Sequence, residues 1–255
     1  MRCFYYTGCG DRTAINKDAL ALPGRAVVRP HMDGPAEFRP YRVLHALCRP
    51  LLCAVVDGMG GYPGGDTAAR LVAETFSSAR CPRQVGEEFL RSLLKSAAAR
   101  LAEETTRHPE LLLMGAVAAG AIVHRRHAVV FNCGDSRVYH WHAGTLKRVS
   151  HDHSIVQELC DAGEIREEEM RFHPHKNRVT AAICTSEDLK PRRLWHASLE
   201  LARGDALLMC SDGVWEALAH SELEAAFRVS KPEAALREAL GGVFCDDNVS
   251  FILLR

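Results

Sequence analysis

Residues 51–61 read LLCAVVDGMGG, an apolar run that ends in an aspartate and a glycine-rich turn. The apolar part, residues 51–56, is short and rich in β-branched side chains, which predicts a buried strand. The glycines after Asp57 allow the backbone to approach a ligand, so a main-chain carbonyl could bind one beside the carboxylate. An Asp-Gly pair after a strand is often only a turn. Similar acids beside other strands of the chain favour a shared ligand site instead.

Three further acidic residues occupy the same place relative to predicted strands. The run AVVFNC leads into Asp135, the run ALLMC leads into Asp212, and Asp247 precedes the run VSFILL. In an antiparallel sheet the end of one strand lies beside the start of the next, so the four acids can converge on one edge. Clustered carboxylates repel one another unless a proton or a cation neutralises them. Oxygen ligands select a hard ion, Mg²⁺ or Mn²⁺, and room for two ions ~3.5–4 Å apart indicates a two-metal hydrolase.

Composition narrows the class of protein. The chain has 255 residues, with 32 basic and 32 acidic side chains and 47% hydrophobic residues, which is typical of one large globular domain or two small ones. The balanced charge argues against nucleic acid or an anionic membrane as the main partner. No apolar run approaches the ~20 residues of a membrane span, and the N-terminus lacks a secretory h-region. We therefore expect a soluble, cytoplasmic protein.

Short apolar runs and helical patterns alternate along the chain. Buried strands are predicted at residues 51–56, 116–123, 128–132, 206–210 and 249–254. Apolar side chains at helical spacing predict helices at residues 67–78, 85–105, 155–162, 221–227 and 232–240. Residues 163–195 are polar, which predicts a segment that lies outside the packed core. Strands that arrive as hairpins, with helices between them, favour a layered α+β domain.

Cysteine and histidine are frequent, with 10 and 13 copies. The chain has no C-x-x-C pair, which argues against a zinc ribbon and favours reduced, structural cysteines. Three H-x-H pairs occur, at His140/His142, His151/His153 and His173/His175. On a strand such a pair points both rings to one face, so a zinc site is conceivable. Because the sequence offers no obvious third ligand, solvated or structural histidines are the favoured interpretation.

An ordered set of motifs resembles the metal-dependent PPM/PP2C serine/threonine protein phosphatases, in their short bacterial form. The matching stretches are VVDGMGGYPGGDTAA, the pair Met114-Gly115, NCGDSRVY, HDHSIVQELCDAGEI, LLMCSDGVWEAL and DDNVSFIL. The resemblance implies a single domain over residues 1–255, built as a four-layer α-β-β-α sandwich of two mostly antiparallel sheets with metals at one edge. It also implies a flap subdomain at about residues 163–190.

The resemblance further implies a role for each acid. Asp57 would bridge two Mn²⁺ or Mg²⁺ ions, and the Gly58 carbonyl would bind the second ion. Asp212 and Asp247 would hold the first ion, while Asp135 and Asp212 would serve a third, weaker one. A hydroxide that bridges the two metals would attack phosphorus in line with the leaving serine or threonine oxygen, without a phospho-enzyme.

The start of the chain departs from the family pattern. Asp18 matches an acid that holds a metal-bound water, but Lys17 stands where glutamate or glutamine is usual. The position of the phosphate-binding arginine holds Thr13, with Arg12 one residue early. Arg12 reaches the phosphate only if a bulge realigns the strand, since a slip of one residue reverses the face. The implied catalytic side chains are those of Asp57, Asp212, Asp18 and Arg12.

The leading hypothesis is an active phosphatase acting on phosphoserine and phosphothreonine in proteins. We expect a monomer whose substrates are the targets of a cognate serine/threonine kinase. The alternative is a catalytically weak pseudophosphatase that binds a partner protein, motivated by Thr13, Lys17 and the pair Ala116-Val117. A phosphodiesterase or zinc hydrolase, suggested by the H-x-H pairs, ranks third. Arg137 in the GDSR motif is either a phosphate ligand or, as we favour, part of a buried salt bridge.

Overall fold

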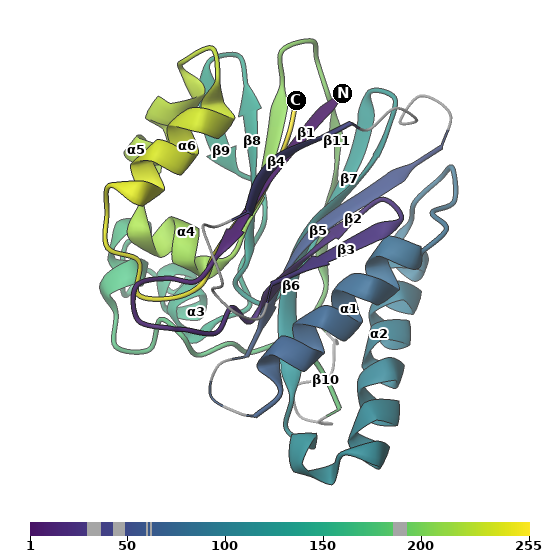
Figure 1. The fold of residues 1–255 in the computed structure, drawn as a ribbon. Helices are drawn as coiled ribbons and strands as arrows, with labels where there is room; N and C mark the ends of the chain where they lie inside the picture. Colours follow the sequence, from purple (N-terminus) through teal and green to yellow (C-terminus); the bar gives the residue numbers. More distant parts are fainter. Residues whose placement is uncertain (30–36, 43–48, 60, 62, 186–192) are drawn as a thin grey trace.

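The structure is a computed structural model that describes residues 1–29, 37–42, 49–59, 61, 63–185 and 193–255. Two antiparallel sheets lie face to face, and helices cover the outer face of each sheet (Figure 1). This arrangement confirms the predicted α+β sandwich of four layers.

The two sheets have different strand orders. The first sheet runs β4-β1-β13-β12-β8-β9, with bounds β4 Glu37–Arg42, β1 Arg2–Gly8, β13 Val249–Leu254, β12 Ala206–Cys210, β8 Arg137–His142 and β9 Thr145–Arg148. The second runs β11-β7-β6-β5-β2-β3, with bounds β11 Trp195–Glu200, β7 His127–Cys133, β6 Gly115–His124, β5 Leu51–Gly58, β2 Asp18–Leu22 and β3 Arg25–Val28. A short strand, β10 (Ile183–Cys184), pairs with β6.

The helices divide between the two outer faces. On the second sheet lie α1 (Gly65–Ser78) and α2 (Glu87–Arg107), and on the first sheet lie α4 (Asp212–Ala217), α5 (His220–Phe227) and α6 (Pro232–Gly241) (Figure 1). The connections carry α3 (Ile155–Asp161) and two 3-10 helices, η1 (Pro109–Leu111) and η2 (Glu167–Phe172). No described helix is long and apolar enough to cross a membrane.

Three apolar clusters fill the spaces between the layers. In β5, Ala54 and Val56 belong to the cluster beneath α1 and α2, whereas Cys53 and Val55 belong to the cluster between the sheets. Because successive side chains of a strand point to opposite faces, β5 is apolar throughout rather than alternating. The third cluster lies between the first sheet and α4, α5 and α6.

Every predicted strand and helix corresponds to an observed element, with ends that differ by at most two residues. The sequence patterns missed the helix α4 and the strands β1, β2, β3, β4, β8, β9, β10 and β11, which are short or carry polar side chains. Residues 163–195 contain η2, β10 and the first residue of β11, and residues 186–192 of this segment lie outside the described part of the chain.

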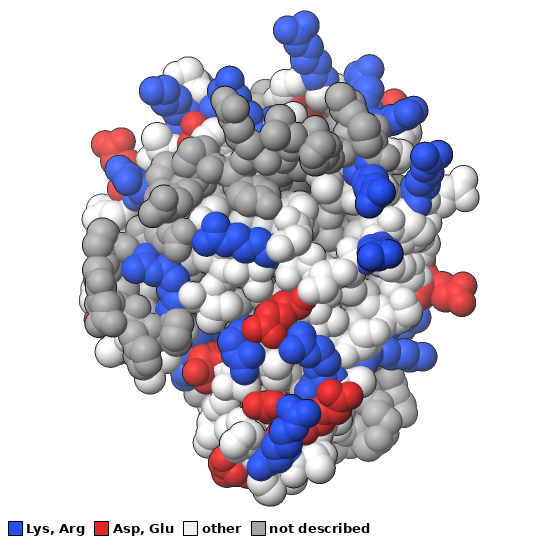
Figure 2. Space-filling model, turned by 45° about the vertical axis from the view of Figure 1, so that its right-hand side comes forward, with Lys and Arg blue, Asp and Glu red and all other residues white. Residues whose placement is uncertain are grey.

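Charged side chains on α1 and α2 form exposed ion pairs. Arg100 of α2 reaches Glu74 of α1 at 3.0 Å, and Arg91 pairs with Glu87 within α2 at 2.6 Å. Such exposed pairs contribute about 0–1 kcal/mol each to stability. On the face that Figure 2 shows, basic and acidic side chains lie side by side in the lower part of the view.

Candidate metal centre

The fold brings five aspartates to one edge of the two sheets. Asp57, near the end of β5, lies opposite Asp18 of β2 in the strand register. Asp212 begins α4 directly after β12, and Asp247 lies just before β13, the neighbour of β12. Asp135 lies in the connection from β7 to β8, where the chain passes from the second sheet to the first. The convergence inferred from strand ends thus arises across two sheets rather than within one.

Four of these carboxylates line a single cavity of about 610 Å³. Its described lining comprises Asp57, Asp135, Asp212 and Asp247 together with Thr13, Lys17, Gly58, Met59, Gly61, Val117, Asn177, Arg178 and Val179. Asp18 lies behind this lining and is 1% exposed. Its Oδ2 accepts a hydrogen bond from Ser211 Oγ at 2.9 Å, and its Oδ1 has no hydrogen-bond partner among the described residues.

Burial and mutual repulsion raise the pKa values of these acids. The pKa of Asp57 lies well above its ordinary value because of burial first and the negative charges of Asp212 and Asp18 next. Burial and the charge of Asp135 raise the pKa of Asp212 in the same way. Burial raises the pKa of Asp18, and likewise that of Asp135, to about 7. Divalent cations would replace the protons that these acids otherwise hold, so the donor set fits hard metal ions.

Two glycines allow the backbone to pack tightly behind the acids. A Cβ on Gly58 would lie 2.0 Å from the carbonyl oxygen of Gly65, at the start of α1. A Cβ on Gly213 would lie 2.1 Å from the carbonyl oxygen of Asn248. Each glycine follows an acid of the cavity directly, so any side chain at either position would displace that acid.

Asn248 positions the loop that leads into β2, a role that the sequence patterns did not predict. Its Oδ1 accepts a hydrogen bond from the Lys17 backbone N–H at 2.8 Å. Its Nδ2 donates to Thr13 Oγ1 at 2.7 Å and to the Ile15 carbonyl at 3.0 Å. Because Asn248 follows Asp247 in the chain, the same turn places an acid in the cavity and fixes the cavity wall.

Of the residues before β2 that the sequence pattern singled out, some line the cavity and one does not. Arg12 is exposed, pairs with Asp246 at 3.1 Å and is not among the residues that line the cavity. Thr13 and Lys17 do line it, and so does Arg178, which precedes the segment of β10 and which sequence reasoning did not single out. Only the structure reveals Arg178, because it lies in an irregular segment and not beside a predicted core strand.

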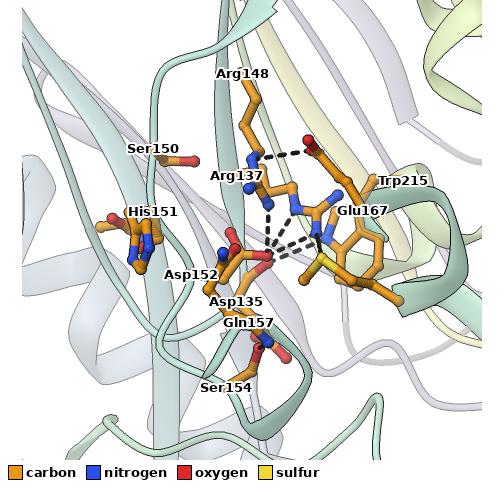
Figure 3. A network of polar contacts seen from close by, with 12 residues as sticks. Asp135, Arg137, Arg148, Ser150, His151, Asp152, Ser154, Gln157, Glu167 and Trp215 are labelled. Atoms are coloured by element: carbon orange, nitrogen blue, oxygen red, sulfur yellow. Dashed lines mark hydrogen bonds and ion pairs between the residues drawn. The ribbon is translucent and has the colours of Figure 1, made fainter. Parts of the chain in front are cut away.

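Arg137 forms the buried ion pair that we favoured over a phosphate contact. Its Nη2 lies 2.7 Å from Asp152 Oδ2, and its guanidinium stacks on the ring of Trp215 at 3.7 Å. Figure 3 shows this stack, with Arg148 connecting Asp152 to Glu167. The indole N–H of Trp215 donates to the Asp135 carbonyl at 3.1 Å, so the network supports the backbone of a cavity acid.

Comparison of the chain with known proteins identifies the family to which it belongs. A sequence model described as Protein phosphatase 2C matches residues 45–240. The chain belongs to this family. It is 30% identical to the serine/threonine phosphatase stp of Listeria welshimeri over 67% of this chain and 69% of that protein. It is thus a metal-dependent phosphatase of phosphoproteins.

Solved structures share the fold of this phosphatase. A bacterial serine phosphatase superposes with a TM-score of 0.80 at 23% identity, covering 98% of this chain and 96% of that one. The catalytic domain of PstP, solved with two manganese ions, superposes with a TM-score of 0.74 at 22% identity, covering 99% and 98%. These similarities confirm the sandwich fold implied by the motifs.

Proposed function

We propose that this phosphatase hydrolyses phosphoserine and phosphothreonine in proteins at a site for two Mn²⁺ or Mg²⁺ ions. The observation that carries the proposal is the convergence of four carboxylates from separate strand ends on one cavity. Asp57 and the Gly58 carbonyl would hold one ion, and Asp57, Asp212 and Asp247 would hold the other. Asp135 and Asp212 serve a weaker third ion. When bound, the ions supply an activated water and neutralise charge on the phosphoryl group.

The remaining residues of the cavity orient water and phosphate. Asp18 offers a buried Oδ1 for which the described part of the chain supplies no donor, and this oxygen is suited to accept a hydrogen bond from water beside the ions. Lys17 and Arg178 supply positive charge in the cavity, whereas Arg12 is engaged with Asp246 at the surface. An arginine can bind two phosphate oxygens at once, so Arg178 is the stronger candidate for phosphate binding.

The single domain with a flap at about residues 163–190 is also a proposal. Asn177 and Val179, from this segment, line the cavity, and Lys176 forms an ion pair with Glu216 of α4. Residues 186–190 of the predicted flap lie outside the described residues. We further propose a cytoplasmic monomer that reverses the action of a cognate serine/threonine kinase.

Phosphate release from phosphoserine and phosphothreonine peptides tests this function. We expect hydrolysis that requires Mn²⁺ or Mg²⁺, stops with EDTA and resumes when excess metal is added. The position of Arg12, which pairs with Asp246 at the surface outside the cavity, favours a second candidate function, a pseudophosphatase that binds phosphorylated partners. A folded, Mn²⁺-saturated sample that binds the peptides without releasing phosphate would establish this alternative instead.

Replacing Lys17 by glutamate is expected to lower the Mn²⁺ concentration for half-maximal activity. At ~7 Å and an effective dielectric of ~20, an ammonium repels each unit of metal charge by about 2 kcal/mol, and solvent reduces this value. If about 1.4 kcal/mol of this repulsion remains after screening, the Mn²⁺ concentration for half-maximal activity falls by about tenfold. Initial rates in a Mn²⁺ titration measure it, with Lys95→Glu on the exposed face of α2 as the control. A raised KM for phosphopeptide at an unchanged half-saturation point would show that Lys17 contacts phosphate instead.

Replacing Asp135 by alanine is expected to spare the two tight ions and still reduce activity on protein substrates. The reason is that Asp135 serves only the weaker ion, together with Asp212, which keeps its other contacts. Calorimetric Mn²⁺ titration and phosphopeptide turnover, measured on the same preparation, separate the two effects. Turnover equal to that of the parent at every Mn²⁺ concentration would show that Asp135 is only a turn residue and serves no ion.

A further inference from the structure

A second cluster of potential metal ligands lies at the far end of the first sheet. It consists of His140 and His142 of β8 and Asp205, the residue before β12. One ligand atom from each of the three residues lies within 4.8 Å of the other two. Asp205 Oδ2 is 2.9 Å from His140 Nε2, and Asp205 Oδ1 is 2.9 Å from His142 Nδ1.

Strand geometry creates the cluster. His140 and His142 are two residues apart in β8, so both rings project from one face, with centroids 5.5 Å apart. In the register of β8 and β12, Trp141 lies opposite Ala206, which places Asp205 beside the two histidines. The missing third ligand of this H-x-H pair thus comes from a residue more than sixty positions away, in a neighbouring strand connection.

The carboxylate is held in place without a metal. Asp205 Oδ2 accepts a hydrogen bond from the Ala202 backbone N–H at 2.9 Å, and the Asp205 side chain is 4% exposed. The His140 side chain is 12% exposed and that of His142 is 56% exposed. A buried, fixed carboxylate beside an accessible imidazole provides rigidly placed ligands for an ion. The remaining coordination position of that ion is open to solvent.

The other two H-x-H pairs lack this arrangement. His153 Nδ1 accepts a hydrogen bond from the Gly134 backbone N–H at 3.2 Å, and His173 Nδ1 accepts one from the His175 N–H at 3.1 Å. Asp161 lies 3.0 Å from His151. Among the described residues, however, neither pair gains a third histidine, cysteine or acid within 4.8 Å of ligand atoms of both its histidines. The His173/His175 pair therefore serves as a matched control.

The cluster is separate from the carboxylate cavity. Asp205 and Asp212 flank opposite ends of β12, seven positions apart in the sequence. At ~3.4 Å per residue in a strand, the two acids are roughly 20 Å apart. An ion at one site therefore shares no ligand with ions at the other.

We propose that His140, His142 and Asp205 form a zinc site distinct from the catalytic metal centre. Two imidazole nitrogens and one carboxylate suit Zn²⁺, whereas the all-oxygen cavity suits Mn²⁺ or Mg²⁺. Tetrahedral zinc with bonds of ~2.0–2.1 Å separates its ligands by about 3.3 Å, so the 2.9 Å contacts need only a small expansion. The ion replaces two hydrogen bonds and cross-links β8 to the turn before β12.

Calorimetric zinc titration of the intact protein, in excess Mn²⁺ to fill the carboxylate cavity, tests the proposal. We expect one equivalent of zinc to bind and to raise the Tm. The His140→Gln/His142→Gln variant should lose at least about a hundredfold in zinc affinity, and the His173→Gln/His175→Gln control should match the parent. If the double variant fails to fold, His142→Gln alone, at an exposed side chain, should still weaken zinc binding.

Two results would overturn the proposal. One is a parent protein that binds no zinc once Mn²⁺ fills the cavity. The other is equal zinc affinity in the parent and in a folded His140 or His142 variant. Neither result bears on phosphatase activity, because the catalytic acids are unchanged in every variant.

Discussion

Replacing Asp57 by asparagine is expected to lower phosphatase turnover by about a thousandfold or more while the fold remains intact. In the proposed centre Asp57 is the side chain that would hold both tightly bound ions, so the change would remove charge from both ions at once. The amide keeps the size of the carboxylate, and the register of β5 with β2 does not depend on the charge.

The same substitution should stabilise the metal-free protein. The pKa of Asp57 is raised by burial and by the neighbouring acids, so asparagine relieves repulsion that an empty centre suffers. We therefore expect a higher Tm than the parent in EDTA and a smaller rise in Tm on adding Mn²⁺. Asp161→Asn, at a half-exposed acid outside the cavity, is the matched control. Tight Mn²⁺ binding that survived unchanged in Asp57→Asn would show that Asp57 is not a metal ligand.

Replacing Arg137 by methionine is expected to reduce the free energy of unfolding by about 3–5 kcal/mol. The loss leaves Asp152 buried, with Arg148 at 3.3 Å as its remaining cation among the residues that the structure describes, and removes the guanidinium stacked on Trp215. Methionine fills much of the same space, so the missing charge dominates the effect. Urea unfolding at fixed pH measures it.

A second substitution separates the buried charge from the lost packing. Changing Asp152 to leucine in the Arg137→Met background should recover part of the stability, because no unpaired buried acid remains. Arg100→Met, which breaks an ion pair with Glu74 that is more than one-third exposed on both sides, should cost no more than about 1 kcal/mol. Equal losses for Arg137→Met and Arg100→Met would contradict the assigned role of the buried pair.

Local sequence was enough to predict the elements that are apolar on both faces. β5, β12 and β13 lie between other layers, so their contiguous apolar runs left little ambiguity about type or bounds. β8 was missed because its buried positions include Arg137, whose charge is satisfied by Asp152, 15 residues later and outside the strand. A polar residue in a buried strand can be recognised only when its partner is known.

Four acids of the centre, Asp57, Asp135, Asp212 and Asp247, were predictable because each lies beside a core strand. Asp18 belongs to β2, which the patterns missed, and only the family resemblance indicated it. The basic side chains were not predictable, since they lie in irregular segments that distant contacts fix. Asp11 accepts a hydrogen bond from the Cys245 backbone N–H at 2.7 Å, and Asn248 holds Thr13, which together orient the loop that carries Arg12. Asp205 escaped notice as a partner of the H-x-H pair for the same reason: strand pairing, not sequence spacing, brings them together.

The most direct measurement of the metal centre is anomalous diffraction at the manganese edge from crystals grown with Mn²⁺. Two strong peaks should lie in the cavity, with a carboxylate of Asp57 in contact with both and with Asp212 and Asp247 on one of them. A weaker third peak should lie beside Asp135. A single peak, or two peaks that Asp57 does not bridge, would contradict the proposed binuclear centre.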